Sequence, residues 1–389
     1  WKKPMPMNLM FQTSIGAMGG SRTAFLRPET AQGMFMLFPA LYRHFRQKLP
    51  FGAMQTGRGY RNEISPRQGM IRLREFNMAE LEYFIDPDDP PIDDLSKWPD
   101  RVCMIPDPDG PHPGEFEMSF KEAFESGIVK HPTVAWFLAM TMEFLEFVGI
   151  DRAKVRFRQH AGSEMAHYAS DCWDCELMGE HGWVEVVGIA NRTCHDLESH
   201  EEHSKSSLLR AWRTYEKPVE KKSEVIKPVG SVIGPTFRER AGEVSSALSK
   251  LQATPSTFPF ELELPDGTIV HIGEDMVNIA VEDSIVSGEY FTPHVIEPAF
   301  GIDRIIWHIL DHNYMEVDKE GEGYTIMSLK PEIAPFDLVV LPLFDKDGMD
   351  KMARDILTRI DSLRGIIAEI DTSRSIGRRY ARADEIGIP

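Results

Sequence analysis

Arginine and glutamate side chains concentrate in one stretch of this sequence, from Gly59 to Phe84. Guanidinium groups bind phosphate oxygens in pairs, an aromatic ring offers a stacking plane, and a carboxylate can accept a hydrogen bond from an exocyclic amine. Arg61, Arg72 and Phe76, with Glu63 between them, therefore suit a nucleoside triphosphate. The same pattern also fits an exposed sheet face laced with salt bridges, and the stretch alone leaves both interpretations open.

Strand periodicity predicts how these side chains are arranged. Alternate residues of a β-strand share a face, so a strand from Arg72 to Phe84 would present its even-numbered residues, including Glu80 and Glu82, on one surface. The odd-numbered residues Ala79 and Leu81 would then point into a core. The polar run ISPRQGM between the two strands predicts a long loop.

A second group of residues lies between His294 and Leu310. The run HVIEPAFGIDRIIWHIL predicts a strand carrying Glu297, a turn at Gly301 and a helix with Arg304 in its first turn. Isoleucines at helical spacing predict the buried stripe of that helix. Arg304 would project toward the same site as the first group.

Composition sets the bounds of the interpretation. The chain has 389 residues, 42% of them hydrophobic, which is enough for about two or three domains. Its formal net charge of −18 argues against a nonspecific nucleic-acid coat, although the arginines between Arg374 and Arg382 allow a local basic patch. Four cysteines are too few for a disulfide scaffold and favour a reducing, cytoplasmic setting. The longest apolar run, Val134 to Ile150, predicts a packed helix rather than a membrane span.

The pattern of elements predicts several segments. Residues 1–85 combine strands with a helix over 28–48, residues 86–127 form a Pro-rich surface insertion, and residues 128–198 return to strands after a helix. Residues 199–275 are charged and lack periodicity except for a helical run and a hairpin with a Pro-Asp-Gly turn, which indicates an inserted module. After Phe336, a strand, an amphipathic helix and a second strand predict a separate βαβ unit.

The longest of these motifs resemble those of a known family. LRPETAQG, RNEISPRQGMIRLREFNMAE, RFRQHAGSEMAHYASDCWD, VIEPAFGIDR and SIGRRYARADEIG are similar to segments of class II aminoacyl-tRNA synthetases, specifically the archaeal and eukaryotic type of glycyl-tRNA synthetase. The resemblance implies an α+β fold, with an antiparallel sheet core flanked by helices. It places the second class II motif in residues 1–85, the third in 276–333, and the start of an anticodon-binding domain in 334–389.

The resemblance also implies a reaction. Members of the family join glycine to ATP, release pyrophosphate, and pass the glycyl group from the adenylate to tRNA(Gly). The catalytic residues would be Arg61, Arg72 and Arg304, and Glu185 would hold Mg²⁺ at the phosphates. The residues implied in ATP binding are Arg61, Asn62, Glu63, Arg72, Leu73, Phe76, Glu185, Val186 and Arg304.

A second set of residues is implied in binding glycine. Acidic side chains would surround the ammonium group, and Arg192 would bind the carboxylate; the set comprises Glu29, Glu80, Arg192, Glu297, Pro298 and Ala299. Ala299 stands where the family usually has serine, which removes one hydroxyl from the pocket. The chain opens on Trp1, downstream of the first class II motif, so we expect a piece of a longer protein that is a homodimer at full length.

Several alternatives accompany this interpretation. A catalytically silent, synthetase-like protein that binds nucleic acid or assists a polymerase would not need the ATP-binding set, and a synthetase for serine, threonine or proline would not need the acidic pocket. Cys172 and Cys175 have the spacing of half a zinc site, a weak signal without a second pair. The run SIGRRYARADEIG also fits a solvated basic loop.

Overall fold

The computed structural model describes residues 7–16, 22–91, 94–205, 207–251, 255, 257–319, 322–344, 346–363 and 365–389, so the opening at Trp1 lies outside the described residues. The chain divides into two compact units. The first comprises Trp1–Leu209 and Thr292–Pro389, and the second comprises Arg210–Phe291. Every helix in the described part of the chain is too short or too polar to cross a lipid bilayer.

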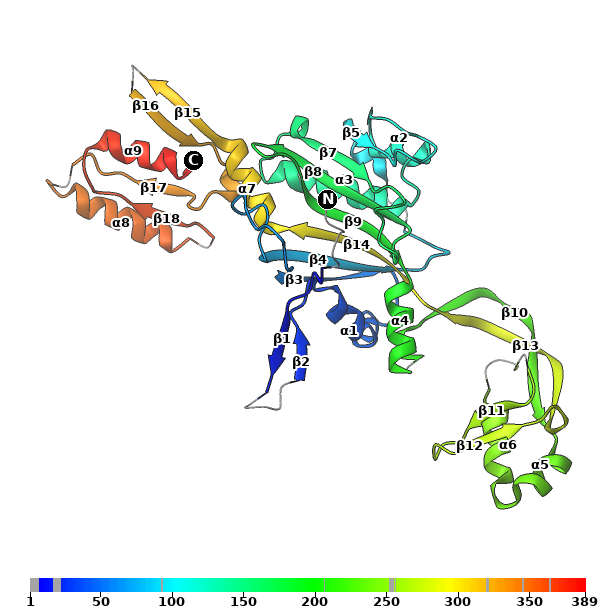
Figure 1. The fold of residues 1–389 in the computed structure, drawn as a ribbon. Coiled ribbons are helices and arrows are strands. Elements are labelled where there is room, and N and C mark those ends of the chain that lie inside the picture. The colour runs from blue at the N-terminus through cyan, green and yellow to red at the C-terminus, as the bar shows by residue number, and fades with distance from the viewer. Residues whose placement is uncertain are drawn as a thin grey trace. The chain divides into compact units, whose positions relative to one another are not determined.

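An eight-stranded sheet forms the centre of the first unit (Figure 1). Its strands follow the order β3, β4, β14, β9, β8, β7, β5, β6, and all neighbours are antiparallel except β5 and β7. The predicted α+β fold with an antiparallel core is therefore confirmed. The strands are β3 (Phe51–Tyr60), β4 (Glu75–Ile85), β5 (Val102–Ile105), β6 (Phe116–Met118), β7 (Val155–Gln159), β8 (Asp171–Gly179), β9 (Gly182–Thr193) and β14 (His294–Gly301).

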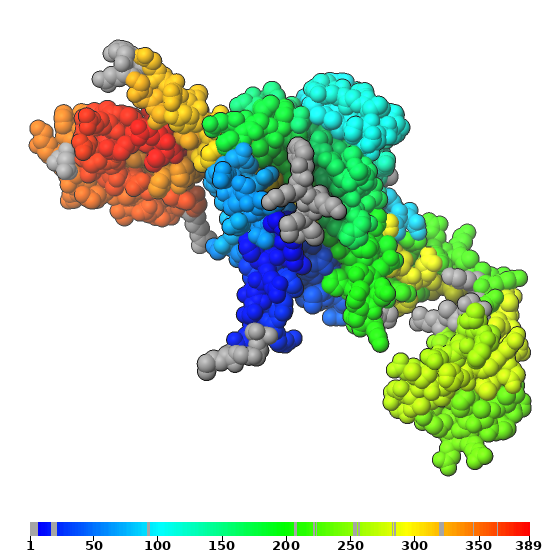
Figure 2. Space-filling view, viewed as in Figure 1, coloured from blue at the N-terminus to red at the C-terminus, as the bar shows by residue number. Residues whose placement is uncertain are grey.

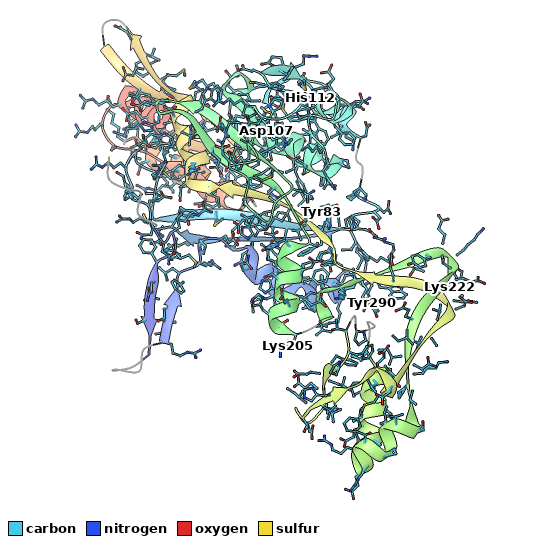
Figure 3. All side chains as sticks on the ribbon, turned by 45° about the vertical axis from the view of Figure 1, so that its right-hand side comes forward. Tyr83, Asp107, His112, Lys205, Lys222 and Tyr290 are labelled. Atoms are coloured by element: carbon cyan, nitrogen blue, oxygen red, sulfur yellow. The ribbon has the colours of Figure 1, made fainter. Side chains whose placement is uncertain are left out.

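Helices cover both faces of this sheet. The predicted apolar helix is α3 (Pro132–Phe147), which begins with a proline at a position where no backbone N–H is needed. Tyr83 of β4, labelled in Figure 3, packs edge-on against Phe137 of α3 with ring centroids 5.4 Å apart. Its strand neighbour Phe84 points to the other face and meets Phe38 of α1 (Ala31–His44) at 5.0 Å. Helix α4 (His195–Ser204) packs beside α1.

Strand β4 differs from the prediction in two ways. It begins at Glu75 rather than at Arg72, so Arg72 lies in the loop between β3 and β4. Its even-numbered face is the more buried one, because α1 covers it, and Glu80 and Glu82 are 2% and 0% exposed. The alternative of an exposed, salt-bridged sheet face is therefore wrong for this end of the strand.

The surface insertion predicted at residues 86–127 differs in part from the structure. Loops occupy much of it, but β5 and β6 extend the edge of the main sheet. The short helix α2 (Phe120–Glu125) is capped reciprocally by Ser119 and Glu122. Met104 and Phe120 lie in the main hydrophobic core, so part of this segment belongs to the sheet layer.

The second unit has a hydrophobic core of its own, and Figure 2 shows it as a rounded lobe in yellow-green. Strands β10 (Ala211–Pro228) and β13 (Val277–Phe291) form a long antiparallel ribbon, although the charged part of β10 was predicted to lack regular structure. The predicted hairpin is confirmed as β11 (Phe260–Glu263) and β12 (Ile269–Ile272). Helices α5 (Gly230–Phe237) and α6 (Ala241–Ser249) complete the unit. The compact unit starts and ends later than the module predicted at 199–275, because residues up to Ser204 still belong to α4.

The C-terminal segment contains the predicted βαβ arrangement. Strands β17 (Leu338–Val340) and β18 (Ala368–Ile370) are parallel and are joined through α8 (Met349–Asp361). The run SIGRRYARADEIG, for which a solvated basic loop was the alternative interpretation, contains helix α9 (Ile376–Glu385), in which Arg379 is 4% exposed. The described chain also contains helix α7 (Ile302–Asn313) and two hairpins, β1–β2 (Gln12–Ile15, Arg22–Phe25) and β15–β16 (Tyr314–Lys319, Glu322–Met327).

The four arginines of the predicted basic patch have different environments. Arg379 donates to the carbonyl oxygens of residues 372, 373 and 374 at 2.8–3.0 Å, which fixes the turn before α9. Arg382 forms an ion pair with Asp371. Arg374 and Arg378 are exposed. The patch therefore offers fewer open charges than the sequence suggests, because half of its arginines are committed to holding the fold.

Candidate functional site

A cleft opens where the β3–β4 loop, the middle of β9 and the junction of β14 with α7 meet. Segments separated by more than two hundred residues form its walls, because β4, β14 and β9 are neighbours in the sheet. Eight of the nine residues predicted to bind ATP line this cleft: Arg61, Glu63, Arg72, Leu73, Phe76, Glu185, Val186 and Arg304. The remaining residue, Asn62, donates instead to the carbonyl oxygen of Asn8 at 3.4 Å, away from the cleft.

The start of α7 ties the parts of the cleft together. The Asp303 carboxylate accepts from the backbone N–H and side-chain amide of Asn77 at 2.6 and 3.0 Å. Arg304 donates through Nε to the carbonyl oxygen of Ile71 at 3.0 Å, and through Nη1 to the carbonyl oxygen of Glu185 at 2.6 Å. Its Nη1 also lies 3.4 Å from the Glu185 carboxylate. One guanidinium therefore fixes both the loop before β4 and the backbone of β9 at Glu185, the residue predicted to hold the metal.

An aromatic ring forms the floor of one side of the cleft. Phe76 lies directly opposite Gly59 on β3, and a Cβ at Gly59 would come within 2.7 Å of its ring. The Arg61 guanidinium lies 5.3 Å from the centre of the same ring and donates to the carbonyl oxygen of Pro28 at 3.3 Å. A planar base could stack on Phe76 while Arg61 reaches a phosphate.

A carboxylate-rich pocket surrounds Arg192 on β9. This side chain is 2% exposed, and its Nε and Nη2 donate to the Asp196 carboxylate at 2.7 and 3.0 Å. Its Nη1 donates to Glu297 at 2.7 Å, and its Nη2 lies 3.8 Å from Glu29. Tyr168 covers the guanidinium at 4.1 Å. Three of the five N–H groups are thus committed to protein carboxylates, and two remain for a ligand.

Glu80 and Glu29 occupy the α1 side of this pocket. Glu80 accepts hydrogen bonds from the backbone N–H and hydroxyl of Thr30, just before α1. Glu29 accepts from the Gln32 side chain at 2.9 Å, and Gln32 also donates to Asp196 at 3.1 Å. The first turn of α1 therefore positions carboxylates around the same space as Arg192.

Burial shifts the protonation of these carboxyls. Desolvation raises the pKa of Glu297 to about 7, against the lowering effect of the Arg192 charge and with a further rise from Glu80. Burial also raises the pKa of Glu80, partly offset by the bonds from Thr30. Burial also acts to raise the pKa of Asp196. Its hydrogen bonds with Arg192 outweigh that effect and hold the pKa of Asp196 below the usual range. The pocket holds more carboxylates than its single guanidinium can neutralise, so a small cationic group would suit it.

Comparison with known proteins identifies the family. Residues 18–101 match the family model described as tRNA synthetase class II core domain (G, H, P, S and T). The chain is 47% identical to glycine–tRNA ligase of Methanothrix thermoacetophila over 98% of its length and 66% of that protein. The corresponding ligase of Archaeoglobus fulgidus is 44% identical over 100% of this chain and 67% of its own length. The chain belongs to the glycine–tRNA ligase family.

Other glycine–tRNA ligases agree with this assignment. That of Methanocaldococcus jannaschii is 44% identical over 98% of this chain and 68% of its own length, so the chain spans about two thirds of these relatives. A solved structure, Giardia lamblia prolyl-tRNA synthetase in complex with prolyl-adenylate, matches with a TM-score of 0.49 and 13% identity over 98% of this chain and 53% of that one.

Pro298 and Ala299, which the resemblance implies in glycine binding, line two different cavities. Pro298 points to the opposite face of β14 from Glu297, because strand neighbours alternate, and its ring lines an apolar cavity beside α3 and α7. Ala299 lies opposite Glu80 and lines the cleft that also contains Arg61 and Arg304. Asp196 of α4 and Tyr168 of the β7–β8 loop also contact Arg192, and neither was predicted from the sequence. The one sequence signal for Asp196 is its place just after the strand-to-helix turn that follows Arg192.

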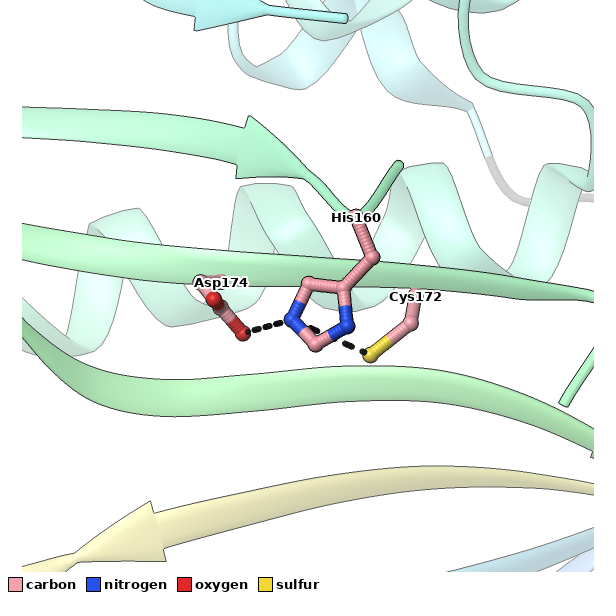
Figure 4. Close-up of side chains that lie close together, drawn as sticks. All are labelled: His160, Cys172 and Asp174. Carbon is pink, nitrogen blue, oxygen red and sulfur yellow. Dashed lines mark hydrogen bonds and ion pairs between the residues drawn. The ribbon is translucent and has the colours of Figure 1, made fainter. Parts of the chain in front are cut away.

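The cysteines of CWDC do not converge on one another. They lie three residues apart on β8 and face opposite sides, with Cys175 buried in the main core. Cys172 instead lies near His160, whose Nε2 is 2.9 Å from Asp174 and 3.9 Å from the Cys172 sulfur (Figure 4). Arg158 donates to the other oxygen of Asp174 at 2.8 Å, and the bond to Asp174 raises the pKa of His160. A hydrogen-bonded ion-pair network accounts for this cluster.

Proposed function

We infer that this chain carries the ATP and glycine sites of a glycine–tRNA ligase. The observation that supports this most directly is that one sheet face holds both an arginine-lined cleft and, next to it, a carboxylate pocket around Arg192. In the reaction, a carboxylate oxygen of glycine attacks the α-phosphorus of ATP, and the bond to the β-phosphate oxygen breaks. Pyrophosphate leaves, and the terminal ribose hydroxyl of tRNA(Gly) then attacks the glycyl carbonyl and displaces AMP.

The cleft residues have distinct roles in this proposal. Arg61 contacts the α-phosphate, where negative charge builds up in the transition state, and Arg72 and Arg304 hold the outer phosphates. Phe76 stacks on adenine, and Glu63 accepts from its amino group. These groups bind and orient the substrates, since adenylate formation needs alignment and charge stabilisation rather than a protein nucleophile.

Magnesium fits the donor set of the cleft. Glu185 is about half exposed and has only a loose pairing with Arg304, so its carboxylate can turn toward an ion. The other acidic side chain of the cleft wall near α7, Asp303, is committed to Asn77. Magnesium takes one or two carboxylates together with phosphate oxygens, and it would neutralise phosphate charge there.

The carboxylate pocket accounts for selection of glycine. Glu29, Glu80 and Glu297 would surround the ammonium group, and the two remaining N–H groups of Arg192 would meet the substrate carboxylate. Because glycine has no side chain, selection works by leaving no space for a methyl group. Ala299 removes a hydroxyl from this region but leaves the charged contacts.

Partners and location follow from this activity. We propose tRNA(Gly), glycine and ATP as substrates, the cytoplasm as the place of action, and a homodimer as the state of the full-length protein. The homodimer rests on the family resemblance.

Pyrophosphate exchange across a panel of amino acids tests the proposal. With the full-length protein, we expect ATP–pyrophosphate exchange that depends on glycine and is far weaker with alanine, serine, threonine and proline. Equal efficiency with glycine and alanine would contradict glycine selection. No exchange with any amino acid would instead indicate a silent synthetase-like protein.

A further inference from the structure

Glu82 is a fully buried carboxyl on the sheet face that holds the amino-acid pocket, and neither sequence nor resemblance assigns it a role. It is 0% exposed. Within the described part of the chain, both of its oxygens lack a hydrogen-bond donor from another group. A buried carboxylate without donors would cost several kcal/mol, so this side chain needs another explanation.

The sheet register supplies that explanation. The pairs Ile296–Tyr83 and Ala299–Glu80 fix β14 against β4, which places Glu297 directly opposite Glu82. Residues in such positions have Cβ atoms about 4.5–5.5 Å apart. Two carboxyl groups therefore share one space from which water is excluded.

Two ionised carboxylates cannot both persist there, because like charges at this separation repel strongly in a low dielectric. Glu297 accepts a hydrogen bond from Arg192 at 2.7 Å, which favours its ionised form. Burial, followed by the charge of Glu297, raises the pKa of Glu82 well above its usual range. The proton of the pair therefore resides on Glu82.

The charged groups around Glu82 come from three strands. Glu80 lies on the same face of β4, Glu297 lies on β14, and Arg192 reaches the site from β9. On the other side, β3 places the uncharged Ala53 opposite Glu82. Arg192 carries the single positive charge among these groups. Its guanidinium already pairs with Glu297, Asp196 and Glu29, so it cannot also neutralise Glu82.

We propose that Glu82 is a positioning residue of the glycine site, a neutral carboxyl group whose O–H donates to Glu297 and holds that carboxylate ready for the substrate ammonium. This rests on the proposed function. Glu82 does not touch glycine; it orients the residue that does. It also keeps the pocket from gaining one more negative charge, which would push Glu297 and Glu80 apart.

Three variants of the full-length protein test this role in glycine-dependent pyrophosphate exchange. Glu82→Gln keeps a neutral hydrogen-bond donor of the same shape, and we expect its Michaelis constant for glycine to stay close to that of wild type. Glu82→Leu removes the donor, and its Michaelis constant for glycine should be roughly tenfold or more above that of Glu82→Gln. The constant for ATP should not change in either variant. Glu80→Gln serves as the comparison for a carboxylate in contact with the ammonium.

The pH profile separates positioning from a structural role. Without its donor, Glu297 should protonate at higher pH, so the loss of glycine affinity on acidification should begin at higher pH in Glu82→Leu than in Glu82→Gln. A rise in the glycine constant of Glu82→Gln as large as that of Glu80→Gln would overturn the proposal, since Glu82 would then be ionised. Identical behaviour of Glu82→Leu and wild type would overturn it as well.

Infrared spectroscopy tests the shared proton without relying on activity. At about pH 9, where Glu297 with its pKa of about 7 is ionised, the wild-type protein should show the carbonyl stretch of a protonated carboxyl, and Glu82→Gln should lose it. If the wild-type protein lacks this carbonyl band, the proposal is overturned, even if its glycine-dependent exchange is normal. If the wild type shows the band but no exchange, the proposed function fails while the proton assignment stands.

Discussion

At the scale of single residues, Arg192 is the centre of the carboxylate-rich pocket that we propose for glycine. It is one guanidinium surrounded by Glu29, Asp196 and Glu297, so the pocket carries excess negative charge before a substrate arrives. Such an arrangement favours a ligand that offers an ammonium group at close range. It also makes the fold depend on Arg192, because these carboxylates would otherwise be buried without a counter-charge.

The first prediction concerns the stability cost of losing that charge. Arg192→Ala should lower the free energy of unfolding of the first unit by about 3–5 kcal/mol, since it leaves buried carboxylates uncompensated. Arg58→Ala is a matched control, because Arg58 pairs with Glu75 at the surface and such pairs contribute about 0–1 kcal/mol. Denaturant titration measures both. Equal losses in the two variants would contradict the central role of Arg192.

The second prediction concerns pH. Burial raises the pKa of Glu297 to about 7, so this side chain loses its negative charge as pH falls through that value. The Michaelis constant for glycine should therefore rise as pH decreases from 8 to 6, while the constant for ATP should change little over that range. Exchange kinetics at several pH values measure both. A flat glycine profile would show that Glu297 stays ionised throughout.

At the scale of residues, the sequence indicates which side chains suit a substrate better than it indicates which residues those side chains contact. Arg61, Arg72 and Arg304 stand out because guanidinium groups near an aromatic ring suit a nucleotide. Thr30, Asp196 and Tyr168 do not stand out, because each joins the pocket through a tertiary contact between distant segments. The shared proton of Glu82 is likewise invisible before the register of β4 against β14 is known.

At the scale of elements, the β3–β4 hairpin supplies the platform that we propose for the base. Gly59 and Phe76 are directly opposite, and the ring occupies the space where a side chain at Gly59 would lie. The glycine is needed here for close approach rather than for an unusual backbone conformation. At Gly69 in the connecting loop, both reasons apply, since its φ is +57° and the Trp307 ring lies 3.1 Å from an added Cβ.

The third prediction follows from this platform. Gly59→Ala should displace the Phe76 ring, because the new methyl group would lie 2.7 Å from it. Loss of base stacking should raise the Michaelis constant for ATP about tenfold and leave the glycine constant nearly unchanged. Gly242→Ala is the control, as no atom outside its own helix and neighbours lies within 4 Å of the added group. An unchanged ATP constant in Gly59→Ala would remove Phe76 from the nucleotide site.

The elements also show which patterns carry structural information. The apolar run from Val134 to Ile150 located α3 to within three residues, because most of that helix is buried in the core. The charged part of β10 gave no such signal, since a two-stranded ribbon with β13 buries little of either face. In α9, the arginine pattern left a solvated basic loop open as an alternative, whereas the Arg379 guanidinium donates to backbone carbonyl groups inside the fold.

At the scale of the whole molecule, the chemistry and the insertion belong to different units. All residues of the cleft and of the carboxylate pocket lie in the first unit, which is built from the two ends of the chain. The second unit has its own core, formed by residues of the ribbon, the hairpin, α5 and α6. Two separate cores in one chain imply two cooperative units of stability.

The fourth prediction tests this independence through the core of the second unit. Leu248 of α6 is fully buried there, so Leu248→Ala should lower the stability of that unit by about 2–5 kcal/mol. Leu251→Ala removes the same atoms from a side chain that is 37% exposed and should cost much less. Scanning calorimetry should show a transition that moves to lower temperature in Leu248→Ala, while the transition of the first unit stays in place. Below the shifted transition, glycine-dependent pyrophosphate exchange should equal that of wild type, because no residue of either substrate site lies in Arg210–Phe291. A parallel loss of exchange would show that the two units are energetically coupled and that the second unit supports adenylate formation.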